Sequence, residues 1–240
     1  PMLINNETSL VSVFGKPDDD TYSHFFAVAN FLSYSSAMWV IRALSDNKNA
    51  TTKGTGVLIK NIDHYETSFE DGSADVGAFA ARYPGTMGNG LKVSIADSGT
   101  FSKWEYKTLF TSTPGTSEYV KAKGGSNDEL HIVVIDALGK FSGTIGTILE
   151  KYSFVSKAID AVSYQGVNNY YKNVLRNQSQ YVYWTDHEAD GVAVPGTEWG
   201  SASAGTTFAS LSDSQYTQIT ATAASCSATV ATLAFTLTGT

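Results

Sequence analysis

An acidic stretch near position 190 carries the densest set of side chains that could bind a metal ion. In Asp186-His187-Glu188-Ala189-Asp190-Gly191, acidic residues hold the first, third and fifth positions and a glycine holds the sixth, as in a calcium-binding loop. Such a loop needs a bidentate glutamate at its twelfth position, where this chain has Thr197. We interpret the stretch as a solvated acidic loop. The rival hypothesis is a metal-dependent hydrolase that uses Asp186, His187, Glu188 and Asp190, and metal analysis would test it.

The histidines of the chain also lie outside the sequence motifs in which catalytic histidines are usually recognised. None of the four histidines lies in a zinc-protease HExxH array or near the G-x-S-x-G elbow of a serine nucleophile; they are His24, His64, His131 and His187. His131 begins an apolar run, so we interpret it as a hydrogen-bonded structural histidine rather than a general base.

Glycine-rich and paired-acid patterns do not indicate a site either. Pro17 follows Gly15-Lys16 where a phosphate-binding loop needs Ser or Thr. The glycines at 85, 88 and 90 lead into a strand rather than a helix, so they indicate a turn and not a dinucleotide site. Asp136 and Glu150 could pair for glycoside hydrolysis, but any chain of this size offers such pairs. The sequence therefore predicts no catalytic, cofactor-binding or metal-binding residue, and a protein that is not an enzyme.

Composition limits the class of protein further. With 42% hydrophobic residues in 240, the chain can bury a substantial core. Its net charge of -7 disfavours a partner with a phosphate backbone, so we expect no nucleic acid. The single cysteine, Cys226, excludes a small scaffold held by internal disulfides. No apolar run approaches the roughly 20 residues that span a bilayer, so we expect no direct membrane insertion.

The first 45 residues predict a strand, a helix and a second strand. Leu10–Phe14 is a short apolar run, and Asp18-Asp19-Asp20-Thr21 offers caps rather than cation ligands for a helix that ends near Leu32. Met38–Leu44 has the pattern of a buried strand, and the order suggests a right-handed crossover. The expected core residues are Phe25, Phe26, Leu32, Trp39 and Ile41. On this basis Phe26→Ala should lower the free energy of unfolding by about 3–5 kcal/mol, because it would leave a cavity in the core.

Beyond a polar stretch at 45–55, which we take as a domain junction, the pattern becomes mostly β. The run at 130–136 is apolar throughout, which is typical of a strand at the centre of a sheet. Residues 147–162 fit either a helix or a hairpin partner of that strand, and periodicity leaves both open. A short helix is expected at 168–175 and a small-residue loop at 191–214. The other expected strands are 56–60, a half-buried 91–96, 181–184 and 231–238.

Two stretches resemble the tail sheath proteins of contractile-tailed bacteriophages. The first comprises Val11–Pro17 (VSVFGKP), Phe25–Tyr34 (FFAVANFLSY) and Val40–Ala43 (VIRA). The second is Ala81–Leu91 (ARYPGTMGNGL). The resemblance implies a mixed α/β protein of the α+β class, with part of the inner sheath domain at 1–47. It also implies an outer insertion domain at 48–240, which ends near the return to the inner domain. It also implies a fragment without the terminal arms of the family.

The same resemblance implies a structural function. Such a subunit polymerises around the tail tube and contracts to drive the tube through the host envelope. Its implied partners are copies of itself in stacked, hexameric rings, the tail tube protein, and the baseplate and tail terminator proteins. Its implied location is the virion tail, after assembly in the host cytoplasm. No cofactor is implied.

The alternative function is a carbohydrate- or receptor-binding β-rich module of a virion. Aromatic side chains can stack on sugar rings. The candidates for such a platform are Trp104, Tyr106, Tyr181, Tyr183, Trp184 and Trp199.

Overall fold

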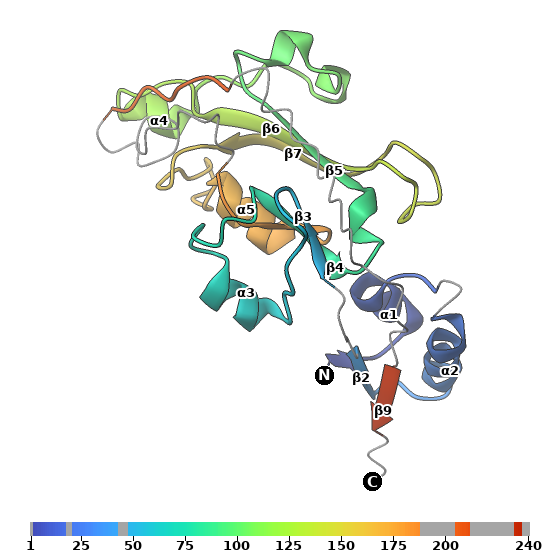
Figure 1. Ribbon diagram of the computed structural model, residues 1–240. Helices are drawn as coiled ribbons and strands as arrows, with labels where there is room; N and C mark the ends of the chain where they lie inside the picture. The colour runs from blue at the N-terminus through green and yellow to red at the C-terminus, as the bar shows by residue number, and fades with distance from the viewer. Residues whose placement is uncertain (1, 18–20, 43–47, 188–204, 212–232, 237–240) are drawn as a thin grey trace.

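The chain forms a small lobe and a large lobe (Figure 1). The computed structural model describes residues 2–17, 21–42, 48–187, 205–211 and 233–236. The small lobe combines residues 2–42 with a strand near the C-terminus, and the large lobe is built from residues 48–187 and 205–211. Helices and strands both contribute to the fold, so the predicted α+β class is confirmed. The boundary at residues 47 and 48 stays a prediction.

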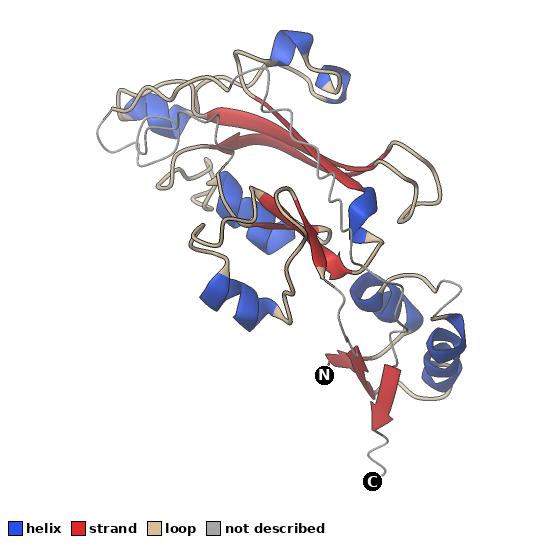
Figure 2. Cartoon of the chain, in the orientation of Figure 1, coloured by secondary structure: helices blue, strands red, loops and turns tan. Residues whose placement is uncertain are grey.

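Two helices cover one face of the sheet in the small lobe (Figure 2). The strands are β1 (Met2–Ile4), β2 (Met38–Arg42) and β9 (Leu233–Thr236), in the order β1-β2-β9 with both pairs antiparallel. The helices are α1 (Glu7–Phe14) and α2 (Tyr22–Leu32). The core between sheet and helices consists of Ile4, Leu10, Phe25, Val28, Met38 and Val40. The predicted helix, the second strand and the C-terminal strand are confirmed within these bounds.

The predicted strand at Leu10–Phe14 is wrong, because this run lies in α1. The side chain of Asn6 caps that helix by accepting a hydrogen bond from the Ser9 amide at 2.7 Å, and Glu7 adds a favourable negative charge to the first turn. The predicted crossover is wrong for the same reason, since the element before α2 is a helix and β2 pairs only with antiparallel neighbours in the described residues.

The predicted core of the small lobe is only partly correct. Phe25 is 4% exposed, but Phe26 is 51% exposed because the buried side of α2 carries Phe25 and Val28. In β2 the inward positions belong to Met38 and Val40. Trp39 and Ile41 therefore point to the opposite face and are 44% and 39% exposed.

The large lobe is organised around an antiparallel sheet of β5 (Leu91–Ala96), β6 (Glu129–Asp136) and β7 (Thr147–Ser156). β6 lies between the other two, so its predicted central place is confirmed. Residues 147–156 form a strand and not a helix, which settles the ambiguity for that part of the chain. The half-buried assignment of β5 is wrong, because five of its six residues are buried beneath elements on both faces.

A second sheet packs against one face of the first (Figure 2). It contains β3 (Asn49–Thr51), β4 (Phe79–Pro84) and β8 (Val182–Trp184), in the order β3-β4-β8. Helix α5 (Tyr171–Gln178) joins this layer and confirms the predicted short helix. The remaining helices are α3 (Ile62–Ser68), α4 (Glu118–Ala122) and the 3-10 turns η1 (Gly88–Gly90), η2 (Phe101–Lys103) and η3 (Lys107–Leu109).

Two further expectations concern loops. The strand predicted at 56–60 is wrong, because only Val57 pairs there, in a single bridge to Asn49. The turn at 88–90 is confirmed as η1, which leads directly into β5. The proposed caps at 18–20 and most of the loop at 191–214 lie outside the described residues.

Candidate functional site

The junction between the two lobes begins where α1 ends. Gly15 terminates this helix with φ +87°, a conformation that favours glycine, and its amide donates to the Val11 carbonyl. A Cβ built at this position would lie 3.6 Å from the Met87 sulfur and 3.8 Å from a ring carbon of Tyr83. The small lobe therefore meets the large lobe through the carboxyl end of α1.

Two side chains hold this end of the helix. The Tyr83 hydroxyl, from β4, donates a hydrogen bond to the Ser12 carbonyl at 2.5 Å, and burial raises the pKa of that phenol. Arg42, from β2, donates to the Val13 carbonyl at 3.2 Å. Burial lowers the pKa of Arg42 below its usual value. A cation there suits the partial negative charge of the last helical turn.

Arg42 also connects the lobes through aromatic rings. Its guanidinium carbon lies 5.2 Å from the centre of the Phe14 ring and 5.9 Å from that of Tyr83, both within the range of cation–π attraction. Neither Arg42 nor Tyr83 has a chemistry-bearing motif. Both residues do lie inside the segments that resemble sheath proteins. That resemblance is the one feature of the sequence from which their importance could have been predicted.

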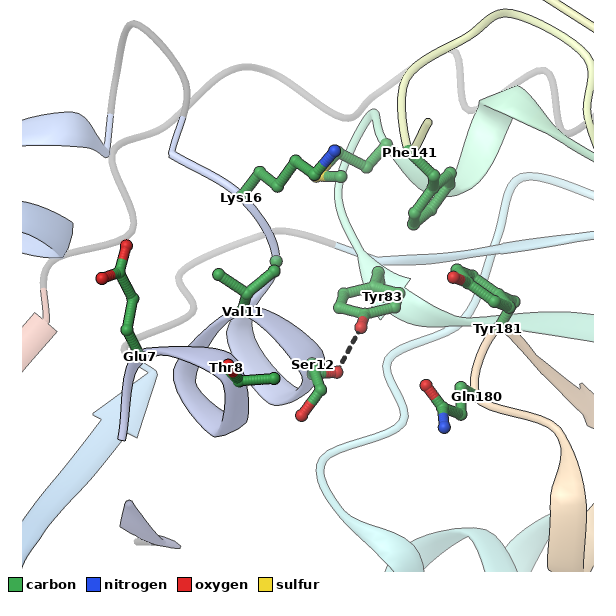
Figure 3. A pocket seen from close by; sticks show the side chains of 11 residues that line it. Glu7, Thr8, Val11, Ser12, Lys16, Tyr83, Phe141, Gln180 and Tyr181 are labelled. Carbon is green, nitrogen blue, oxygen red and sulfur yellow. Dashed lines mark hydrogen bonds between the residues drawn. The ribbon is translucent and has the colours of Figure 1, made fainter. Parts of the chain in front are cut away.

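A groove of about 460 Å³ runs along this junction (Figure 3). Residues of α1 form one wall, and Tyr83, Phe141 and Tyr181 form the other. The ring of Phe141 lies 5.4 Å from that of Tyr83 and 5.3 Å from that of Tyr181. The charged side chains that line the groove in the described part of the chain are Glu7 and Lys16. A surface that mixes aromatic and polar groups in this way is typical of a contact between two protein surfaces.

The structure places the start of the acidic stretch in an aromatic cluster. The ring nitrogens of His187 lie 2.6 Å from the Tyr171 hydroxyl and 3.3 Å from the Tyr170 hydroxyl. Burial, with a smaller contribution from Lys172, lowers the pKa of His187 to about 4. Asp186 accepts a hydrogen bond from the His187 amide at 2.7 Å. Both side chains thus serve local packing.

The metal hypothesis gains no support from the described residues. Among them, no group of three or more His, Cys, Asp or Glu side chains is arranged to hold an ion. Glu188, Asp190 and Thr197 lie outside this part of the chain.

The other histidines and the acidic pair are also used locally. His131 is buried, with one ring nitrogen 2.9 Å from the Ser112 carbonyl and the other 3.1 Å from the Phe154 amide, as expected for a structural histidine. Asp136 accepts hydrogen bonds from the amides of residues 140–142. Glu150 accepts from the Ser179 hydroxyl and the Gln180 amide. His64 accepts from the Lys60 amide, and His24 contacts its neighbour Ser23.

The proposed sugar-stacking platform is largely internal. Trp104 and Trp184 are each 2% exposed and Tyr183 is 8% exposed. The Trp104 ring nitrogen donates to the Ser94 hydroxyl at 2.8 Å, as a core tryptophan requires. Tyr106 and Tyr181 are partly buried, and Trp199 lies outside the described residues. The three buried rings are therefore core residues and cannot form a stacking surface.

A comparison with known proteins identifies a relative among bacteriophage proteins. Over 151 residues the chain is 36% identical to the tail sheath protein of Salmonella phage ViI. The match covers 62% of this chain and 22% of the relative. It supports the resemblance to tail sheath proteins. No protein-family model matches the chain. In the part of the chain that the structure describes, none of the helices has the length and apolar character needed to span a bilayer.

Proposed function

We propose that the chain is part of the structural subunit of a contractile bacteriophage tail sheath. The observation that carries the proposal is the 36% identity to a phage tail sheath protein over 151 residues. The subunit polymerises around the tail tube, and its lattice contracts to drive the tube through the host envelope. Residues 1–47 belong to the inner domain. The outer domain begins at residue 48 and ends near the return of the chain to the inner domain, where β9 pairs with β2. The protein is structural and uses no cofactor.

The partners follow from this role. Copies of the subunit form stacked rings of six, which contact the tail tube protein, the baseplate and the tail terminator. The subunit resides in the virion tail after assembly in the host cytoplasm.

Two features of the described residues suit a lattice subunit. The lobes meet at a groove with mixed polar and aromatic walls rather than through a continuous core. The small sheet presents Leu3, Trp39 and Ile41, all exposed, on the face opposite its helices. Apolar surface of this kind marks a contact between proteins. Contraction of a sheath needs no catalytic group, because a lattice of subunits can exchange one set of contacts between subunits for another.

Electron microscopy of the full-length protein tests the proposal. We expect tubes of stacked rings from the purified protein. Antibodies raised against residues 48–187 should label the tail of the phage particle along its length. A full-length protein that stays monomeric, together with label confined to another part of the particle, would refute it.

A further inference from the structure

The groove between the two lobes, which we call the junction groove, is large enough for a small ligand. Its volume of about 460 Å³ lies within the range of roughly 300–1,000 Å³ that is common for ligand pockets. One wall comes from α1 in the small lobe, and the other comes from the large lobe (Figure 3). A molecule bound in the junction groove would therefore contact side chains of both lobes.

Two partly buried rings, Phe141 and Tyr181, line the wall formed by the large lobe. Their centres lie 5.3 Å apart and their planes meet at 89°, so the edge of one ring contacts the face of the other. Tyr83, which is 8% exposed, packs against both rings from β4. Rings held in place in this way offer apolar surface to a ligand and lose little conformational freedom when it binds.

Polar side chains beside these rings have unused hydrogen-bonding capacity. Within the described residues, the Gln180 side-chain amide and the hydroxyls of Tyr181 and Thr8 have no hydrogen-bond partner. Gln180 uses only its main-chain amide, which donates to the Glu150 carboxylate at 2.6 Å. The three free groups can therefore donate to a ligand and accept from it.

The main chain around the junction groove is already paired. The Val11 carbonyl accepts from the Gly15 amide, and the Ser12 carbonyl accepts from the Tyr83 hydroxyl. β4 lies between β3 and β8, so this strand is not at an edge of its sheet. A peptide is often recognised through hydrogen bonds to its main chain, and these positions do not offer them. An occupant of the groove is therefore recognised mainly by side chains.

The charge of the junction groove favours a neutral ligand. Glu7 and Lys16 contribute one negative and one positive side chain, and the other lining residues in the described part of the chain are neutral. A single lysine accompanied by a carboxylate is a poor site for a phosphate, which binds best where several donors and cations converge. Sugar hydroxyls both donate and accept hydrogen bonds, and the apolar face of a sugar ring packs on an aromatic ring.

We propose that the junction groove binds a neutral saccharide. Phe141 and Tyr181 contact the apolar face of a sugar ring, and the Gln180 amide forms hydrogen bonds with its hydroxyls. Of the six aromatic residues that the sequence suggested as a stacking platform, Tyr181 is the one that lines the groove among those the structure describes. The inference goes beyond the proposed function and does not depend on it, because the whole site lies within one chain.

Saturation-transfer difference NMR of the full chain with neutral disaccharides tests the proposal. The probes are maltose, cellobiose, lactose, trehalose and N,N′-diacetylchitobiose. We expect transfer to the ring protons of at least one of them. In titrations with that disaccharide, Gln180→Ala and Phe141→Leu should each raise the Kd at least about threefold, as expected for loss of one hydrogen bond or one ring contact.

A second tyrosine–glutamine pair, Tyr164 and Gln165, provides the matched control. Tyr164 is 96% exposed, and its hydroxyl accepts from the Gln165 amide at 2.9 Å. Neither residue lines the junction groove. Gln165→Ala should therefore leave the Kd unchanged, whereas Gln180→Ala raises it. Near-ultraviolet circular dichroism checks that each variant folds. If Phe141→Leu changes that spectrum, Tyr181→Phe replaces it, because it keeps the ring and removes only the free hydroxyl.

Two results would overturn the proposal. One is the absence of saturation transfer to every disaccharide of the panel. The other is a Kd that Gln180→Ala and the ring variant leave unchanged, which would place the saccharide elsewhere on the chain. A fluorescein-labelled proline-rich decapeptide is the competing probe, because such peptides also dock on aromatic grooves. Anisotropy that shows binding of this peptide, lost in Gln180→Ala, without binding of any disaccharide would assign the groove to a peptide and also overturn the proposal.

Discussion

The Tyr83 hydroxyl contacts the Ser12 carbonyl at 2.5 Å, so a side chain of the large lobe binds the last turn of a helix in the small lobe. Tyr83→Phe keeps the ring and removes this hydrogen bond. We expect the free energy of unfolding to fall by about 1 kcal/mol, the usual net contribution of one such bond. Urea denaturation followed by circular dichroism measures the change.

Tyr164→Phe is the control for this substitution, because Tyr164 is 96% exposed. Its free energy of unfolding should match that of the unmodified chain. If both variants unfold at the same urea concentration as the unmodified chain, the hydroxyl of Tyr83 does not hold the junction.

Phe25 and Phe26 form a matched pair for testing the core of the small lobe. Phe25 is 4% exposed and Phe26 is 51% exposed, although they are adjacent in α2. Phe25→Ala should lower the free energy of unfolding by about 3–5 kcal/mol through loss of buried area and formation of a cavity. Phe26→Ala should cost less than about 1 kcal/mol, because half of that ring already contacts solvent. Thermal or urea melts with the opposite ranking would contradict the assigned helix face.

The wrong prediction for Phe26 shows a limit of what sequence periodicity can predict. Helical spacing selects a stripe of apolar residues, but a wide stripe does not reveal which edge meets the sheet. The same limit applies to Leu10–Phe14, where five residues are too few for periodicity to separate helix from strand. The cap at Asn6 was the missed signal, since its side chain fixes the start of α1.

Longer patterns were more informative. The continuous apolar run of β6 correctly placed it at the centre of a sheet, because only a strand covered on both faces tolerates such a run. The buried ion pair of the large lobe could not be found from such a pattern. Asp97 and Lys157 are far apart in the sequence and carry no motif, so only the folded chain reveals that they pair.

Lys157→Met tests the buried ion pair. The substitution leaves the Asp97 carboxylate buried without its cation, and we expect a loss of about 3–5 kcal/mol in the free energy of unfolding. Lys53→Met is the control: Lys53 pairs with Asp75, but the two side chains are 61% and 80% exposed. Lys53→Met should lower the free energy of unfolding by less than about 1 kcal/mol. Equal urea midpoints for the two variants would contradict the structural role of the pair.

His187 predicts a pH dependence of stability with a definite sign. Its pKa is about 4 in the folded chain, below the ordinary value of 6.5, so the unfolded chain binds the proton more readily. The contribution of His187 is therefore complete above pH 6.5 and is lost as the pH falls toward 4, by up to about 3 kcal/mol.

His187→Gln removes this titration while keeping a side chain that can hydrogen-bond to Tyr171. The variant will be less stable at neutral pH if the ring packing contributes, so the readout is the slope of unfolding free energy against pH and not its absolute value. We expect a shallower slope between pH 4 and 6.5 than in the unmodified chain. Some slope remains, because burial also lowers the pKa of His131. Urea denaturation at half-unit pH steps measures both curves, and parallel curves would show that His187 is not held neutral by its aromatic surroundings.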